Sequence, residues 1–341
     1  MKKFICIILS VLMLFATLTL VACNKNNDGE GESDTPAADV AGLKFGLGVY
    51  SEASATSATA DKDGTGEANI TAAVITVDAD GKVVACQLDT AQNKVKYTIE
   101  GKAVANDGFK TKYELGNDYN MVLYGKAAKE WFEQADIFEG VVVGKTLDEI
   151  KALVAEGDKG TQDVITAGCT IMVDEFVKAI ENAFANLADS DATAASTIKL
   201  AMSTEQAIKD ATDEKVGENK IETTIFAAAL DAEGKVLAVK TDCVQVKFTF
   251  DKTGASKYDA TKAASSKRQL GNDYGMVAYS NGAVTKEWFE QADAFEGLCV
   301  GKTISEIVAL CAADNYGTDA VKAAGCTILV DGFTKAAAKL G

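Results

Sequence analysis

The sequence predicts an α+β protein with two homologous domains, each a twisted, mostly antiparallel sheet with packed helices. One observation is internal repetition: Ala-Gly-Cys-Thr at 167–170 returns at 324–327, 157 positions later, as expected after a duplication. Another is the order within each copy, where alternating apolar and polar residues come first and helical spacing follows. Strands followed by a run of helices are typical of the α+β class.

The repeated segments also set the domain boundaries. KEWFEQADIFEG at 129–140 returns as KEWFEQADAFEG at 286–297. We therefore expect domains at 43–187 and 197–341, joined by a linker at 188–196. Each copy has roughly 145 residues, enough to bury a core of its own, so we expect each to fold alone.

Residues 1–22 resemble a lipoprotein signal peptide. A positively charged start precedes an apolar run that ends in Leu20-Val21-Ala22-Cys23, which resembles a bacterial lipobox. We expect cleavage before Cys23 and its diacylation, rather than an uncleaved membrane helix. Two acyl chains suffice for stable anchoring in membrane lipid. The acidic segment 23–42 then reads as a tether, which places the protein at the cell membrane on the extracytoplasmic side.

Composition narrows the chemistry. The formal net charge of −16 argues against a nucleic-acid partner, because phosphates need basic side chains. The sequence contains no histidine, which removes Ser-His-Asp catalysis, Cys-His catalysis and imidazole metal ligation. We predict no metal site and no catalytic residues, and we favour an electron carrier or a binding protein over a turnover enzyme.

The cysteines do not indicate a disulfide framework. Apart from Cys6 in the signal segment and Cys23, only Cys169 and Cys326 occupy equivalent places in the two copies. A framework inside each domain should have duplicated with the domain. There is also no Cys-x-x-Cys, so we predict buried free thiols rather than zinc or dithiol chemistry.

Each copy begins with a predicted hairpin. Asp80-Gly81 stands between alternating apolar segments, and Asp-Gly in such a place is a strong hairpin signal. The second copy repeats this pattern with Glu233-Gly234. Further strand-like stretches lie at 94–101 and 244–251.

Helices follow the strands. Trp131, Ala135 and Phe138 have the i, i+4, i+7 spacing of one helix face, which the second copy repeats with Trp288, Ala292 and Phe295. Such a stripe favours core packing over stacking on an aromatic cofactor. Capping boxes at Thr146 with Glu149 and at Thr303 with Glu306 open the next helix.

After each Ala-Gly-Cys-Thr we expect a short buried strand, at 170–173 and 327–330. A final amphipathic helix should follow, capped by Asp174 in the first copy and Asp331 in the second. The repeated Leu-Gly-Asn-Asp-Tyr segments contain turn residues. They favour a structural turn, with a polar ligand pocket as the alternative.

This series of elements is similar to the FMN-binding domain. The domain occurs in the sodium-pumping quinone reductase, in electron-transfer flavoproteins and, in tandem, in flavin-bearing surface lipoproteins. Its hallmark is approximately Asp-x-x-Ser/Thr-Gly-Ala-Thr, whose last threonine a flavin transferase joins to FMN through a phosphoester. The resemblance covers 43–187 and 197–341, and rests on a Gly-x-Thr turn before an amphipathic helix.

The resemblance implies that Gly168 and Thr170, like Gly325 and Thr327, take the places of the family's glycine and acceptor threonine. The match is imperfect, because alanine replaces the Ser/Thr, cysteine replaces the alanine and the aspartates are displaced. It implies FMN as the cofactor, covalent or non-covalent, with a flavin transferase and redox proteins as partners. In such domains the protein positions the flavin and the cofactor carries the redox chemistry.

Two classes of function therefore stay open. The first is a membrane-anchored lipoprotein with two FMN-binding-like domains that carries electrons. The second is a non-catalytic surface lipoprotein that binds a small ligand or a protein partner without flavin.

Overall fold

The computed structural model describes residues 42–262 and 264–341. Residues 41–341 form one compact unit. The predicted signal peptide, the lipidation site Cys23 and all but the last residue of the predicted tether lie outside the described residues. Within the described part, no helix has both the length and the apolar character that crossing a bilayer requires.

Both copies begin with long antiparallel strands. In the first copy the sheet order is β1-β2-β3-β4, and in the second it is β5-β6-β7. The strands are β1 (Lys44–Thr56), β2 (Gly64–Val77), β3 (Val83–Tyr97), the short β4 (Ala103–Val104), β5 (Thr197–Lys209), β6 (Gly217–Leu230) and β7 (Val236–Phe250). The two sheets, with helices packed on them, confirm the α+β class. Homology of the copies stays a prediction from the repeated sequence.

The predicted hairpins are confirmed. The turn around Gly81, which has φ +77°, joins β2 to β3, and Gly234 does the same for β6 and β7 with φ +78°. Of the further stretches predicted at 94–101 and 244–251, residues 98–101 lie outside the strand, whereas 94–97 and 244–250 form the far ends of β3 and β7. They are continuous with the hairpin because no turn residue interrupts the alternation.

The two sheets pack face to face. One apolar cluster takes side chains from both copies, among them Ile70 and Val95 from the first and Ile225 and Phe248 from the second. At the far end of the strands the Tyr97 and Phe250 rings stack with centroids 4.3 Å apart. Polar contacts join the sheets too, since Asn93 Nδ2 donates to Thr223 Oγ1 over 2.9 Å. The copies therefore share a core.

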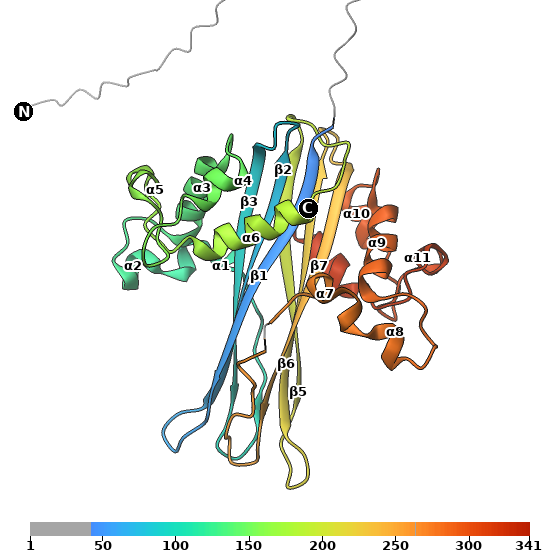
Figure 1. The fold of residues 1–341 in the computed structure, drawn as a ribbon. Helices are drawn as coiled ribbons and strands as arrows, with labels where there is room; N and C mark the ends of the chain where they lie inside the picture. The colour runs from blue at the N-terminus through green and yellow to red at the C-terminus, as the bar shows by residue number, and fades with distance from the viewer. Residues whose placement is uncertain (1–41, 263) are drawn as a thin grey trace, which may run out of the picture. The chain divides into compact units, whose positions relative to one another are not determined.

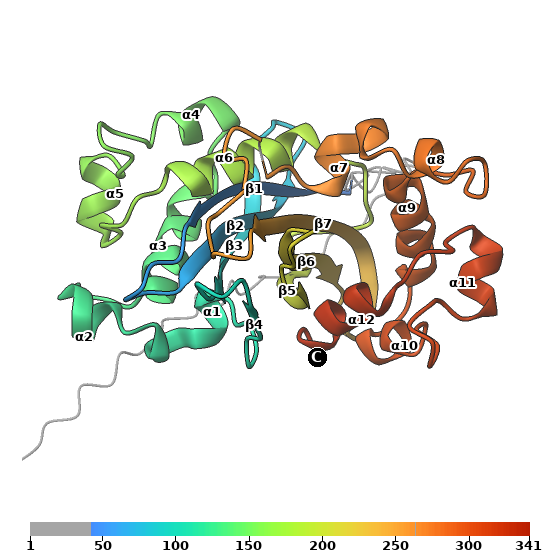
Figure 2. The ribbon, with the colours of Figure 1, turned by 90° about the horizontal axis from the view of Figure 1, so that it is seen from below.

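Helices cover the outer face of each sheet (Figures 1 and 2). The first copy supplies α1 (Lys112–Leu115), η1 (Gly116–Tyr119), α2 (Met121–Gly125), α3 (Trp131–Val142), α4 (Leu147–Lys151), α5 (Gln162–Ala167) and α6 (Asp174–Ala185). The second supplies α7 (Lys267–Leu270), η2 (Gly271–Tyr274), α8 (Met276–Tyr279), α9 (Trp288–Cys299), α10 (Ile304–Val308), α11 (Asp319–Ala324) and α12 (Asp331–Ala338). The layers lie in the order helices, sheet, sheet, helices. A separate apolar core lies between each sheet and the helices that cover it.

Most helix predictions are confirmed. The stripe of Trp131, Ala135 and Phe138 is buried against the first sheet, and its counterpart on α9 is buried against the second. Thr146 and Glu149 form the predicted capping box, as do their counterparts at the start of α10. The Gly-Asn-Asp-Tyr segments form the 3₁₀ turns η1 and η2, as the structural-turn interpretation expected.

Two local predictions are wrong. No strand forms at 170–173 or 327–330, where Met172 makes a single bridge to Lys159 and is 60% exposed. The reason is that the chain turns directly from α5 into α6, so only Val173 at the end of this run is buried with Cys169.

The capping role of the two aspartates is also wrong. Asp174 is the first residue of α6 and Val173 is its N-cap, with no side-chain cap hydrogen bond. Its carboxylate instead accepts from Lys178 Nζ one turn later, at 3.1 Å. Asp331 behaves alike at the start of α12 and pairs with Lys335.

The prediction of free thiols is confirmed for the described cysteines. All six are unbonded to one another, and all except the half-buried Cys311 are buried. Burial raises the pKa of Cys169 and of Cys326 to about 11, so both stay protonated at neutral pH.

The shared core makes independent folding of the copies testable. Expressed separately, 43–187 and 197–341 should each self-associate, because each would expose the inner sheet face that now packs on the other copy. Size-exclusion chromatography with light scattering would measure this, with the joined chain as the control. A cooperatively folded monomer of either copy would contradict the expectation.

Candidate functional site

The two Ala-Gly-Cys-Thr turns have the same geometry. Gly168 ends α5 with φ +113°, and Gly325 ends α11 with φ +99°, in the left-handed region that favours glycine. A Cβ at Gly168 would lie 3.1 Å from Ile137 Cδ1, and one at Gly325 would lie 2.3 Å from Lys286 Nζ. Glycine is therefore favoured by the backbone conformation, since the neighbouring Ile137 and Lys286 side-chain ends could move to admit a Cβ.

A buried glutamine holds each threonine. The Thr170 N–H and hydroxyl both donate to Gln134 Oε1, over 2.8 and 3.0 Å, and Gln134 is 1% exposed. Thr327 donates to Gln291 Oε1 in the same way, over 2.8 and 2.9 Å. Both threonines are exposed, while the cysteine before each is fully buried. The turn thus carries an exposed threonine whose hydroxyl group is fixed by the glutamine.

The amide end of the same glutamine holds another element. Gln134 Nε2 donates to Lys129 O over 3.0 Å and approaches Met121 Sδ at 3.4 Å. Met121 begins α2, whose first two N–H groups donate to the Glu130 carboxylate over 2.8 and 3.1 Å. The second copy repeats these contacts through Gln291, Met276 and Glu287.

Each short helix held in this way carries an exposed tyrosine. Tyr124 is 81% exposed and Tyr279 is 86% exposed, and each lies three residues after the methionine that contacts the glutamine. Met172, two residues after Thr170, is also exposed. Each copy therefore combines an exposed threonine and an exposed tyrosine with an exposed apolar residue, Met172 in the first copy and Leu329 in the second.

The structure brings the predicted residues together within a copy but not between copies. Gly168 and Thr170 share the turn after α5, and Gly325 and Thr327 share the turn after α11. The turns belong to the two outer helical layers, with both sheets between them (Figures 1 and 2).

The sequence analysis missed Gln134, Gln291, Tyr124 and Tyr279. All four occur in segments repeated between the copies, KEWFEQ and Met-Val-x-Tyr. That repetition was the available signal.

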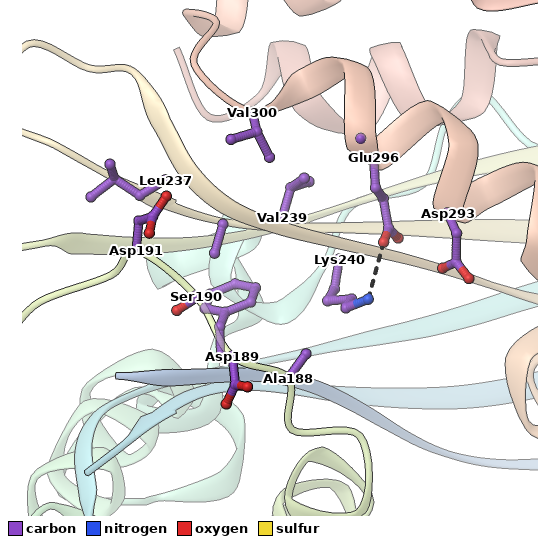
Figure 3. Close-up of a pocket in the computed structure, with 13 residues that line it drawn as sticks. Ala188, Asp189, Ser190, Asp191, Leu237, Val239, Lys240, Asp293, Glu296 and Val300 are labelled. Carbon is purple, nitrogen blue, oxygen red and sulfur yellow. Dashed lines mark hydrogen bonds and ion pairs between the residues drawn. The ribbon is translucent and has the colours of Figure 1, made fainter. Parts of the chain in front are cut away.

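A separate cavity of about 520 Å³ lies where the copies meet (Figure 3). The first copy lines it with Phe45 and residues 188–191, and the second with residues 237–240 and one side of α9. Its wall holds Asp189, Asp191, Asp293 and Glu296, and Lys240 Nζ lies 3.3 Å from Glu296 Oε2. The predicted linker 188–196 thus forms part of this cavity wall.

The first copy also holds perturbed carboxyl groups. Burial raises the pKa of Glu139 from 4.5 to about 8, and the nearby Asp136 and Asp89 carboxylates raise it further. The hydrogen bond from Leu88 N lowers this pKa but does not offset the effect of burial. Burial likewise raises the pKa of Asp89 to about 6. Within the described residues, no group of three or more metal-ligating side chains is placed to hold a metal ion.

Comparison with known proteins does not assign this chain: no family model, curated protein or solved structure matches it. The resemblance to the FMN-binding domain stays a prediction.

Glu139 predicts a pH dependence of stability. Unfolded, its carboxyl group ionises near 4.5, whereas in the folded chain it keeps its proton to about pH 8. The folded state binds more protons in this window, so its stability falls as pH rises from about 4.5 to 8. Replacement by Gln keeps an acceptor for Leu88 N and removes the titration. Between pH 5 and 8 the parent chain should lose about 3.5 kcal/mol of unfolding free energy that the Glu139→Gln variant keeps.

Urea unfolding at the two pH values measures this difference. Glu156→Gln is the matched control, because Glu156 is exposed in a loop and the charge change is the same. The prediction would be contradicted if the free energy of unfolding changed by the same amount between the two pH values in the parent and Glu139→Gln chains.

Proposed function

We propose that this chain is a membrane-anchored extracytoplasmic lipoprotein that carries flavin on its two turns and transfers electrons. FMN would be esterified to Thr170 and Thr327, and Cys23 would hold the chain to the membrane through lipid. A flavin transferase and external redox proteins would be its partners.

The observation that supports this proposal is the set of glutamine contacts found in both copies. In both copies a buried glutamine fixes the threonine and also contacts the methionine that begins the short helix carrying the exposed tyrosine. Thr170 Oγ1 gives its hydrogen to Gln134, which leaves its lone pairs free for a phosphoryl group. An exposed tyrosine ring suits an aromatic cofactor, because aromatic groups stack.

The layer order bears on how electrons would move. Two sheets packed face to face are about 10 Å apart, and a helical layer lies outside each. Flavins on the two turns would therefore sit on opposite sides of the unit. We infer two separate carriers that each meet redox partners, rather than a direct relay from one flavin to the other.

A second candidate is a binding protein without flavin, which the cavity between the copies favours. Its size falls in the range of small-molecule sites, and apolar and acidic side chains line it together.

The flavin proposal predicts two covalent additions. Intact-mass measurement of protein from its native membrane should show up to two FMN-sized increments. Thr170→Ala and Thr327→Ala should remove one each, because each removes the hydroxyl that accepts the phosphoester. Thr166→Ala is the control, since Thr166 is exposed on the last turn of α5 and lies four residues before the acceptor.

An unmodified mass with flavin fluorescence retained after dialysis would replace the covalent site with a non-covalent one. An unmodified mass without flavin would reject the proposal and leave the binding protein.

The anchor is tested separately. The parent chain should enter the detergent phase on Triton X-114 partitioning, and Cys23→Ala should stay in the aqueous phase because it lacks the acyl chains. Cys6→Ala is the control, because Cys6 lies inside the predicted signal peptide. Equal partitioning of the Cys23→Ala and parent chains would show that the lipobox interpretation is wrong.

A further inference from the structure

The two copies place different side chains around an equivalent pair of carboxylates. In the second copy, Glu296 accepts the Thr241 N–H over 2.6 Å at the edge of β7, and it is buried. Arg268 lies against it: Nη2 donates to Glu296 Oε1 over 2.5 Å, and Nη1 lies 2.8 Å from Asp293 Oδ1. Arg268 Nε also donates to the Thr241 carbonyl oxygen over 2.5 Å.

The first copy keeps the carboxylates in place. Glu139 Oε1 accepts the Leu88 N–H over 2.6 Å at the edge of β3, as Glu296 does on β7. Asp136 stands one turn before Glu139 on α3, as Asp293 does before Glu296 on α9. The acceptors that surround the guanidinium group in the second copy therefore have counterparts in the first.

Two cations, Arg268 and Lys240, pair with Glu296 in the second copy. Uncharged residues take their places in the first copy. Tyr113 takes the place of Arg268 and Gln87 takes the place of Lys240. Tyr113 donates its hydroxyl to Asp136 Oδ1 over 3.1 Å, which leaves the second oxygen of Asp136. Within the described part of the chain, Glu139 forms no ion pair with a lysine or arginine, unlike Glu296 in the second copy. Burial, with the nearby Asp136 and Asp89 carboxylates, raises the pKa of Glu139.

A cavity with a mostly apolar lining adjoins this edge at Leu88 and Tyr113, the residues that contact Glu139 and Asp136. Gln87, Leu88, Asp89 and Tyr113 line this cavity of about 260 Å³, and the buried Gln87 Oε1 has no hydrogen-bond partner. The two lysines that line this cavity already have partners within the chain. Lys339 Nζ lies 2.7 Å from Glu114 Oε1, and Lys199 Nζ donates to the Leu340 carbonyl oxygen. On α3, Asp136 and Gly140 on either side of Glu139 are exposed.

We propose that the edge of β3 in the first copy, at Glu139 and Asp136, is a binding site for a guanidinium group supplied by a ligand. The second copy provides the template, in which one planar cation meets two carboxylates and a strand carbonyl oxygen. Guanidinium fits this arrangement better than ammonium, because its fixed N–H groups serve several acceptors in one plane. The unpartnered Gln87 Oε1 adds an acceptor where the second copy has Lys240.

The test uses the full chain in detergent, with ethylguanidinium as the probe and isothermal titration calorimetry as the measurement. One molecule should bind per chain, and ethylammonium should bind about tenfold more weakly. At pH 9, where Glu139 is ionised and both probes are still cations, Glu139→Gln should lower the affinity for ethylguanidinium about tenfold. The substitution removes the charge but keeps the acceptor for Leu88 N. Glu156→Gln is the control for loss of net charge.

Tyr113→Arg gives a second and sharper variant. It supplies from within the chain the cation that the second copy already has, so binding should be lost while the chain stays folded. Its thermal midpoint should be at least that of the parent chain. Retained binding in a folded Tyr113→Arg chain would overturn the proposal. So would equal binding of ethylammonium, or equal weakening by Glu156→Gln, either of which indicates unspecific attraction to an acidic protein.

The source of the guanidinium group is distinguished by two further ligands. Tighter binding of a glycine-flanked arginine peptide than of argininamide would assign the site to a protein partner. Equal binding of the two would assign it to a small guanidino compound. Binding of neither would overturn the proposal.

Discussion

The rest of the structure depends on the contact between the inner faces of the two sheets. Each face is apolar, and each is covered by the other copy. The faces interlock closely: a Cβ at Gly66 of the first copy would lie 2.3 Å from the Phe248 ring of the second. Burial of apolar surface is the dominant favourable term in folding, so separation of the faces would be costly. This contact explains why a duplicated sequence forms one compact unit.

Because the inner faces are occupied, the exposed chemistry lies in the outer layers and at the edges where the copies meet. The outer layers repeat each other closely, down to the glutamine that holds each threonine. The edges differ between the copies. Arg268 forms an ion pair with Glu296, whereas no cation of the described residues pairs with Glu139. Packing constrains both outer layers alike, but an edge residue meets a different neighbour in each copy. The two halves can therefore differ there without disturbing the shared core.

Local signals predicted the local structure well. Asp80-Gly81, the Trp131 stripe and the Thr146 capping box each specify their element within a few residues, and each is confirmed. The short strand at 170–173 failed because an apolar run of this length does not distinguish a strand from a turn. The sheet-to-sheet contact was missed, although residues 70–77 are apolar or threonine throughout and are buried without alternation. Such a run indicates burial on both faces, which a sheet covered on one side only would not need.

The candidate site shows the same limit, because its threonine lies 36 residues from the glutamine that fixes it. The sequence points to the threonine as a candidate acceptor, but only the fold shows the glutamine that holds it. The structure also shows what the departures from the family motif affect. Cys169 is fully buried in the core between the first sheet and its helices, so it is not part of the surface of the turn. Ala167 is exposed, so the absence of a hydroxyl there changes the surface and not the turn. The geometry that presents Thr170 is thus independent of both substitutions, and their effect would fall on recognition of the turn by a transferase.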